Sequence, residues 1–372
     1  MKVQYFEAGL VIVILLVVTA LDWVMPTLTR RDLLFGVTVA PNSRETDAGR
    51  RIITRYRIGI IIVDILVAAG VGLLLAFAPD DFWRAGLSAL IILVAVLLFG
   101  VPYLMAHFAS RSLAVVPQAG ERSQQPQVAP AAELRPRHYG DYVPLIWELL
   151  PLAIIAATVA YLATQYASAP AIIATHFDTA GNANAYRPKT IGSYFALVWS
   201  QLGLYLLLTI VSILMVGAKV IPGRAEERFR RIWLRMIFAI KTFLLALFGF
   251  LAVAIAQAAT GKHFAAAWIA PVTIGATLVM LVAVFAVSLR TGQGGARLDP
   301  ATATTTDRMD DRYWKYGAFY VNASDPSLFV ERRYGVGWTL NFGNPRAIAV
   351  FAGVLALPIV IAVLSIVFST TR

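Results

Sequence analysis

Long apolar runs, separated by polar connections rich in arginine, make up most of this 372-residue chain. A helix needs about 20 residues to cross the roughly 30 Å hydrocarbon layer of a bilayer. About eight runs reach that length, and they predict helices because a helix satisfies its own backbone hydrogen bonds in lipid. The predicted spans are 5–24, 58–78, 85–106, 143–166, 194–217, 237–258, 268–289 and 347–368.

The composition agrees with this pattern. Hydrophobic residues make up 59% of the chain and charged residues 14%, which is more apolar than an ordinary soluble domain. The fold class we predict is an all-α polytopic membrane protein. The net charge of +11 comes from arginines beside the apolar runs, so we interpret it as membrane topology and expect no direct binding of nucleic acid. Without cysteine the chain has no disulfide, thiolate metal site or thiol nucleophile.

The basic residues also predict how the helices are oriented. They concentrate in the connections after the first, third, fifth and seventh spans, whereas the other connections carry few, such as Arg84, Arg187 and Lys262. Cytoplasmic loops carry the excess of Lys and Arg in membrane proteins. We therefore expect a multi-pass protein of the cell membrane with both termini outside. The first run lacks an Ala-x-Ala cleavage site, so we expect it to be retained as a helix.

These spans and connections divide the chain into four predicted parts. Residues 1–142 hold three helices and a Pro/Gln-rich cytoplasmic linker, and residues 143–290 hold helices four to seven with an extracellular loop around His176. Residues 291–346 form a small cytoplasmic module rich in aromatic residues, and residues 347–372 form the last helix.

The cytoplasmic module is predicted to be a β-hairpin. Val336, Trp338, Leu340 and Phe342 alternate with small or polar residues, as in a half-buried strand, and a turn at 324–326 separates them from the apolar positions near Phe319. The large and basic side chains of this module are candidates for contacting a cytoplasmic partner: Trp314, Arg332, Arg333 and Trp338.

The outer loop between spans four and five, residues 170–189, gathers polar groups that are scarce elsewhere in the chain. The predicted ligand-binding residues are His176, Asp178, Gly181, Asn182, Asn184, Tyr186 and Lys189. Glycine and asparagine permit tight turns, a His-x-Asp pair can bind a metal or share a proton, and Lys189 can hold a carboxylate. Alternatively, Asp178 and Asn182 satisfy loop amides and Lys189 lies at the lipid headgroups, which makes the loop structural.

Metal and cofactor chemistry has little support in the sequence. One histidine with one carboxylate falls short of the three or four ligands of a zinc site. No phosphate-binding glycine loop, His-Glu-x-x-His or Gly-x-Ser-x-Gly motif occurs. We therefore expect no metal, no cofactor and no catalytic residue, which favours a function other than catalysis.

Three charged residues lie within predicted spans. Asp64, Glu148 and Lys241 each follow the cytoplasmic edge of their helix by about five residues, which predicts that they share one depth in the membrane. Ionisable groups at such positions face a partner or a wet cavity, or extend toward the interface. Both a structural ion pair and a proton or ion pathway agree with this pattern.

Two segments resemble known families. The segment HFDTAGNANAYRPK, with His176, Asp178, Gly181, Tyr186 and Lys189, is similar to the bacterial membrane family called domain of unknown function 1648. The runs DDRYWKYGAFYVN and DPSLFVERRYGVGWTLNFGNP resemble its companion, domain of unknown function 5808. The run LLFGVTVAPNS fits the same group, which includes SdpI-type immunity proteins. The resemblance implies protection against a secreted antimicrobial peptide and, in such systems, binding of a cytoplasmic regulator.

Three functions follow as alternatives. The first is an SdpI-like immunity or sensor protein that recognises an extracellular peptide or toxin and signals to a cytoplasmic partner. The second is a secondary transporter or channel-like protein that uses Asp64, Glu148 and Lys241. The third is a membrane-embedded enzyme that uses His176 and Asp178. Membrane lipid is an expected partner in all three.

Overall fold

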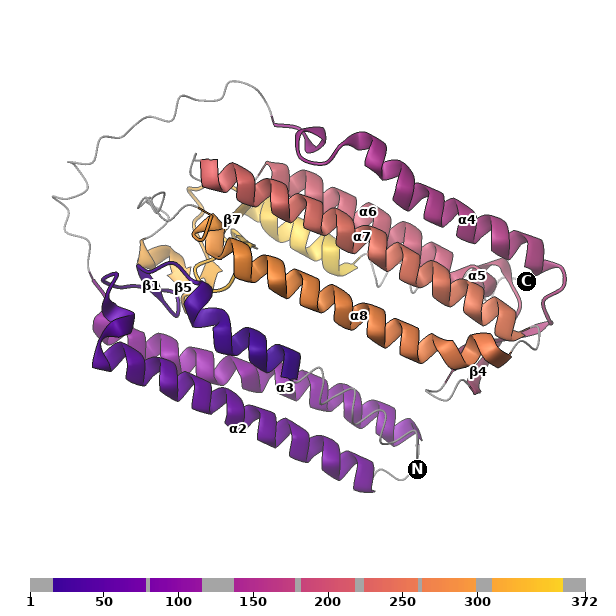
Figure 1. Ribbon diagram of the computed structural model, residues 1–372, viewed down its shortest axis with the longest axis horizontal. Helices are drawn as coiled ribbons and strands as arrows, with labels where there is room; N and C mark the ends of the chain where they lie inside the picture. The colour runs from indigo at the N-terminus through magenta and orange to yellow at the C-terminus, as the bar shows by residue number, and fades with distance from the viewer. Residues whose placement is uncertain are drawn as a thin grey trace. The chain divides into compact units, whose positions relative to one another are not determined.

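The chain folds as a set of long apolar helices with short hairpins at their ends (Figure 1). A computed structural model describes residues 16–77, 81–115, 137–177, 182–217, 224–259, 263–298 and 310–356. Six helical stretches in these ranges are long and apolar enough to cross a membrane: Asp47–Leu74, Leu93–Leu113, Leu145–Tyr166, Ala196–Val216, Glu227–Ala259 and Trp268–Gly295. They confirm the fold class of an all-α, multi-pass membrane protein.

The first and last predicted spans coincide with shorter apolar helices. These are Leu16–Leu28 and Pro345–Ala356. The remaining parts of those two spans, residues 5–15 and 357–368, lie outside the described residues.

Two helices begin well before the apolar runs that predicted them. α2 spans Asp47–Phe77 and α7 spans Arg224–Ala259, although their apolar runs start near residues 58 and 237. Arginine is a good helix former, so the basic segment before each run continues the helix instead of ending it. The change from polar to apolar residues therefore does not mark the start of the helix.

The chain divides into two compact units. The first contains Met1–Leu134, Lys219–Glu227 and Phe285–Asn344. Its long helices are α2 and α3 (Asp81–Ser110), which pack along each other, with Gly59 of α2 against the ring of Pro102. Large apolar side chains on the outer side of this pair are exposed, as expected for helices that face lipid.

Three small two-stranded sheets belong to the first unit. β1 (Leu33–Leu34) pairs with β2 (Val37–Thr38), β5 (Trp314–Lys315) with β6 (Phe319–Tyr320), and β7 (Phe329–Glu331) with β8 (Trp338–Leu340), all antiparallel. Short 3-10 turns lie next to these strands or to the ends of the helices in the chain: η1 Ser43–Glu45, η2 Arg111–Leu113, η6 Gln293–Gly295 and η9 Asp311–Tyr313.

The aromatic module thus differs in detail from the single hairpin that its sequence predicts. β8 pairs with β7, and it touches the earlier strand through a bridge between Tyr320 and Asn341. Gly335 and Gly337 both adopt positive φ, which gives the chain a tight turn between β7 and β8. β7 is nearer to β8 along the chain than β6 is, so β8 pairs with β7 and not with β6.

The second unit contains Arg135–Ala218, Arg228–Val284 and Pro345–Arg372. Its elements in order are η4 Tyr139–Asp141, η5 Leu145–Glu148, α4 Leu149–Tyr166, β3 Ile172–Phe177, β4 Ala183–Pro188, α5 Ile191–Tyr194 and α6 Ala196–Val216, then most of α7 and of α8 (His263–Thr291).

A close helix crossing lies inside the second unit at Gly249 of α7. A Cβ atom there would lie 2.8 Å from Thr158 Oγ1 and 3.2 Å from Gln201 Nε2. Gln201 is fully buried and donates to the carbonyl of Leu245 at 2.8 Å. The missing side chain of Gly249 therefore lets three helices approach at one point.

The chain is structured on both sides of the segment that holds most of the predicted Pro/Gln-rich linker. Residues up to 115 complete α3 and η2, and Ala114 bridges to Val39. From residue 137 the chain enters η4. Residues 116–136, which contain most of the predicted linker, lie outside the described residues.

Candidate functional site

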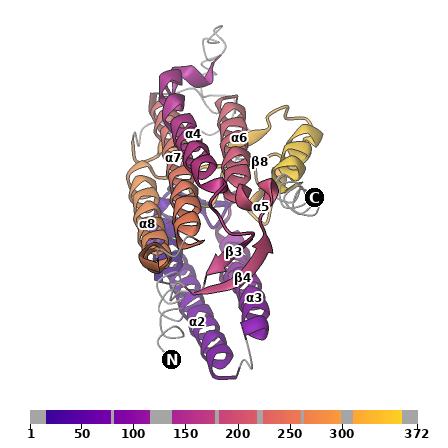
Figure 2. The same cartoon turned by 90° about the vertical axis from the view of Figure 1, so that its right-hand side faces the viewer.

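The predicted outer loop folds as a β-hairpin between α4 and α5 (Figure 2). β3 and β4 pair antiparallel, with Ile172 opposite Pro188, Ala174 opposite Tyr186 and Phe177 opposite Ala183. The register shifts on both sides of His176, which indicates a bulge at that position. Each strand has one neighbour in the described part of the chain, so its other edge carries no strand partner there.

Lys189 fixes the base of this hairpin to the end of α4. Its ammonium group donates to the carbonyl oxygens of Tyr166 at 3.0 Å and Ala169 at 2.6 Å, and it lies 5.1 Å from the centre of the Tyr166 ring. The last carbonyls of a helix lack intrahelical donors and attract positive charge. The Lys189 amide also donates to the carbonyl of Ala171 at 2.8 Å and extends the ladder.

A capping box then starts α5 immediately after the hairpin. Ser193 donates its amide to Thr190 Oγ1 at 3.1 Å, and Thr190 donates its amide to Ser193 Oγ at 2.9 Å. The hydroxyl of Ser193 also donates to the carbonyl of Pro188, the last residue of β4, at 2.7 Å. Both ends of the hairpin are therefore tied to helices by specific hydrogen bonds.

Aromatic rings fill the space behind these contacts. Tyr166 packs edge-on against Tyr194 with ring centres 5.1 Å apart, and Phe195 lies 5.4 Å from Tyr194. Burial raises the pKa of Tyr194 above its ordinary value, so its hydroxyl stays neutral. The rings hold the hairpin base against the helix ends.

The structure describes only some of the predicted ligand-binding residues. Asn182 and Tyr186 are exposed, and the Tyr186 hydroxyl donates to the carbonyl of Ala183 at 3.3 Å. His176 and Asn184 lie on β3 and β4, but their side chains are not described, and Asp178 and Gly181 lie outside the described residues. The predicted His-x-Asp pairing therefore stays a prediction. Among the described residues no three His, Asp or Glu side chains form a group able to hold a metal.

Two of the three predicted intramembrane charges form a pair in the second unit. The Lys241 ammonium lies 2.7 Å from both carboxylate oxygens of Glu148 and donates to Thr209 Oγ1 at 3.1 Å. The Lys241 side chain is 1% exposed and that of Glu148 13%. Three acceptors match the three N–H donors of lysine, and the ring of Tyr205 lies 4.9 Å from the ammonium.

Tyr139 of η4 completes this cluster from outside the spans. Its hydroxyl donates to Glu148 Oε1 at 2.8 Å. Burial, together with the hydrogen bond and charge of Glu148, raises the pKa of Tyr139, so the phenol keeps its proton. The arrangement is a neutral, internally satisfied network.

Asp64, which was predicted to share the role of this pair, belongs to the first unit. Thr19 of the helix Leu16–Leu28 donates to Asp64 Oδ2 at 2.6 Å. Depth along the helix was the only reason to group Asp64 with Glu148 and Lys241, and depth does not decide the direction in which each helix turns its side chain.

Arg333 organises the aromatic-rich module. Its guanidinium donates to the Gly36 carbonyl at 3.0 Å and to Thr38 Oγ1 at 3.0 Å, and it forms an ion pair of 2.5 Å with Asp311. Burial lowers the pKa of Arg333, and the nearby Asp311 opposes that shift. Arg333 and Trp314 are 1% and 7% exposed, so both pack inside the module, while Arg332 is exposed and Trp338 is half-buried.

The β1–β2 hairpin packs against the aromatic-rich module, and the sequence did not predict this contact. Phe35 packs against Tyr56 of α2 at 4.7 Å between ring centres and against Tyr334 at 5.7 Å. The Tyr334 hydroxyl donates to that of Tyr56 at 2.7 Å, and His107 Nδ1 lies 2.9 Å from the Phe35 carbonyl. Gly36 was the usable sequence signal, because glycine readily adopts the positive φ found here, whereas the positive φ of the bulky Phe35 could not be foreseen.

Arg44 binds the segment that precedes β1. Its Nη2 donates to the carbonyls of Thr29 at 3.1 Å and Leu33 at 2.5 Å, and also to that of Arg30. Burial lowers the pKa of Arg44 to about 10. One arginine thus holds residues 29–33 in place between the first helix and β1.

Two segments of the chain match models of known protein families. Residues 153–200 match the Domain of unknown function (DUF1648), and residues 324–348 match the Family of unknown function (DUF5808). The chain carries both family segments, in that order. The first match covers most of α4, the β3–β4 hairpin and α5, and the second covers β7 and β8. No curated protein and no solved structure matches the chain.

Proposed function

We propose that this multi-pass membrane protein is an SdpI-like immunity or sensor protein that captures an external antimicrobial peptide along the β3–β4 hairpin. The supporting observation is a two-stranded sheet with open edges, tied to the end of α4 by Lys189 and to the start of α5 by the Thr190–Ser193 box. An extended peptide can add a strand to such an edge, with main-chain hydrogen bonds for affinity and side chains for specificity.

The exposed side chains of the hairpin suit a peptide that is partly apolar. Ile172 is 62% exposed and Tyr186 is 61% exposed, and Arg187 is exposed on the same strand as Tyr186. Tyrosine and arginine are enriched among residues that dominate protein interfaces. Because the hairpin base is already ordered, a peptide that binds there loses little affinity to the ordering of its partner.

The arginine asymmetry of the sequence supports an external position for this hairpin and a cytoplasmic position for the aromatic module. In the proposal, the exposed side chain of Arg332 and the accessible part of Trp338 form the contact with a cytoplasmic regulator. Trp314 and Arg333 contribute by holding the module together.

The transporter and enzyme alternatives have less support. The ammonium of Lys241 already has three acceptors, so the pair with Glu148 offers no free group to a passing ion. The enzyme alternative depends on His176 and Asp178, whose side chains lie outside the described part of the structure, so no described contact supports it.

The test is photo-crosslinking in intact cells. A photoreactive phenylalanine analogue replaces Tyr186, or replaces Tyr316, an exposed tyrosine of the cytoplasmic module that serves as the control. The cells are exposed to peptide fractions secreted by competing bacteria. We expect a peptide adduct at residue 186 and none at residue 316. In parallel, Tyr186→Ala should sensitise the cells to the same fraction at unchanged membrane abundance. Adducts at neither position across fractions that kill the deletion strain would refute peptide capture by the hairpin.

A further inference from the structure

The start of α2 carries a row of side chains that changes from basic to apolar. Arg51, Arg55, Ile58, Ile62 and Ile65 are spaced by three or four residues, which places them on one side of the helix. Ile58 and Ile62 are each 51% exposed, and Ile65 is 62% exposed. The row therefore runs from exposed arginines directly into an exposed apolar stripe.

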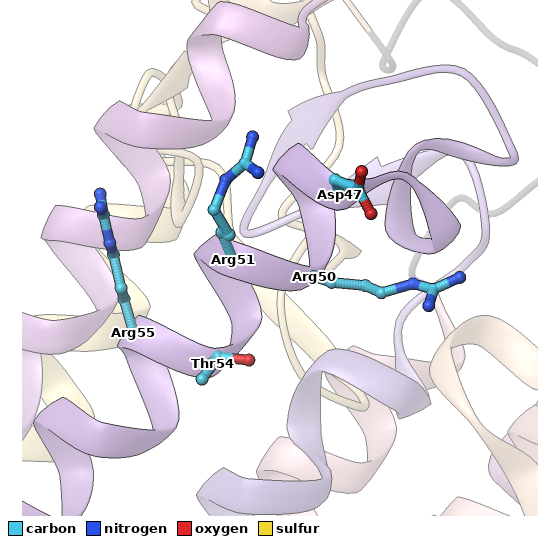
Figure 3. Close-up of a pocket in the computed structure, with 5 residues that line it drawn as sticks. All are labelled: Asp47, Arg50, Arg51, Thr54 and Arg55. Carbon is cyan, nitrogen blue, oxygen red and sulfur yellow. The ribbon is translucent and has the colours of Figure 1, made fainter.

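The two arginines of this row have no protein partner. Neither forms a hydrogen bond or an ion pair with another residue in the described part of the chain. Their side chains rise from the same side of the helix, whereas Arg50 points away and donates Nε to the Glu45 carbonyl at 2.9 Å (Figure 3). Two unpaired guanidinium groups one turn apart repel each other unless an anion lies between them.

A hollow of about 370 Å³ lies at these residues and gives an anion room to bind. Asp47, Arg50, Arg51, Thr54 and Arg55 line it. Three arginines against one aspartate make the hollow positively charged, and the Thr54 hydroxyl adds a donor. Arginine suits phosphate well because its planar group donates two parallel hydrogen bonds.

The positions of Arg51 and Arg55 along α2 match the depth of a lipid headgroup. At 1.5 Å per residue, Arg55 lies about 4.5 Å and Arg51 about 10 Å before Ile58, the first exposed isoleucine of the stripe. The headgroup layer adds about 5–7 Å to the hydrocarbon on each face of a bilayer, and a long arginine side chain can extend further along the helix. A phosphate in the hollow would thus lie at headgroup depth with its acyl chains along the isoleucines.

We propose that Arg51, Thr54 and Arg55 form a binding site for the phosphate of an anionic phospholipid, whose acyl chains pack on Ile58, Ile62 and Ile65. Clusters of basic residues beside membrane helices attract anionic lipids. This site adds to that general attraction a hollow and a continuous apolar track, so it should retain a particular lipid molecule.

The test is native mass spectrometry of the purified full-length protein in detergent, titrated with dioleoylphosphatidylglycerol or dioleoylphosphatidylcholine. We expect the wild-type protein to retain one phosphatidylglycerol molecule in preference to phosphatidylcholine. Arg51→Gln combined with Arg55→Gln should weaken that first binding event by about 10- to 30-fold, as expected from the loss of two basic residues. Thermal unfolding should stay unchanged, because neither side chain holds another residue.

The matched control is Arg228→Gln combined with Arg231→Gln. It removes the same charge from two exposed arginines near the start of α7. An equal loss of affinity in the control would show general electrostatic attraction and overturn the site, as would unchanged binding in the Arg51/Arg55 variant. Inorganic phosphate added at the same concentration as the lipid should not displace bound phosphatidylglycerol. Displacement of the lipid by that phosphate would show a site for free phosphate.

Discussion

Replacing Lys241 with methionine tests whether the buried pair stabilises the second unit. Methionine keeps most of the side-chain volume but leaves Glu148 without its cation and Thr209 without its donor. The Tyr139 hydroxyl would still donate to the Glu148 carboxylate. The free energy of unfolding should therefore fall, because a buried carboxylate has lost the charge that compensated its removal from water.

The magnitude follows from the burial of the pair. Lys241 is 1% and Glu148 13% exposed, so solvent screens the interaction only weakly. Removing one partner of a buried pair costs about 3–5 kcal/mol. At about 2–4 °C per kcal/mol for large domains, the midpoint of thermal unfolding should fall by about 6–20 °C. Lys241→Met combined with Glu148→Gln should recover most of this loss, because no charge is left unpaired.

The assay is heating of the purified protein in detergent, followed by size-exclusion chromatography of the fraction that stays monodisperse. Lys315→Met is the control, since Lys315 is exposed and a surface substitution changes stability by about 0.5 kcal/mol or less. If Lys241→Met behaves like this control, or if the double variant loses as much as the two single variants added together, the two groups do not stabilise each other and our reasoning about the network is wrong.

Three further predictions concern the module, the hairpin and the topology. Gly36→Ala should lower the free energy of unfolding by about 1–3 kcal/mol, because Gly36 has φ of +78° and a Cβ atom there would lie 2.3 Å from the Gly317 carbonyl oxygen. The control is Gly70→Ala, which has open space around it and should not destabilise the protein in the same thermal assay. Lys189→Met should cost about 1–2 kcal/mol through the lost helix-end hydrogen bonds and should speed proteolysis of the hairpin, and unchanged cleavage would argue against the anchor. Because the chain has no cysteine, Asn182→Cys should react with a membrane-impermeant maleimide in intact cells and Ser324→Cys only after permeabilisation; the reverse pattern would invert the predicted orientation.

Much of the fold could be predicted from the sequence because the rule involved is local. Length and apolarity alone decide whether a segment can cross the hydrocarbon layer, so the six long helices and the two shorter ones fall where the apolar runs do. The same rule did not give the starts of α2 and α7, because arginine continues a helix into water as readily as it marks the membrane edge.

The sites depended on contacts between segments that are distant in the chain. Depth along a helix predicted that Glu148 and Lys241 lie at one level, but their pairing, and the addition of Tyr139, required the helices to turn these side chains toward each other. Likewise, Arg333 is polar and was expected at a surface, yet Gly36, Thr38 and Asp311 surround it. A buried charge is tolerated only where such partners converge, and the sequence does not show which partners will meet.

By itself, then, the sequence determined the membrane class, the helices and the predicted direction of their insertion, since each follows from the transfer of a single segment between water and lipid. Only the tertiary structure decided that the 170–189 segment is a hairpin tied to α4 through Lys189, and that Phe35 and Tyr334 join one aromatic cluster. These features depend on hydrogen bonds and ring contacts that form only once the helices have brought their ends together.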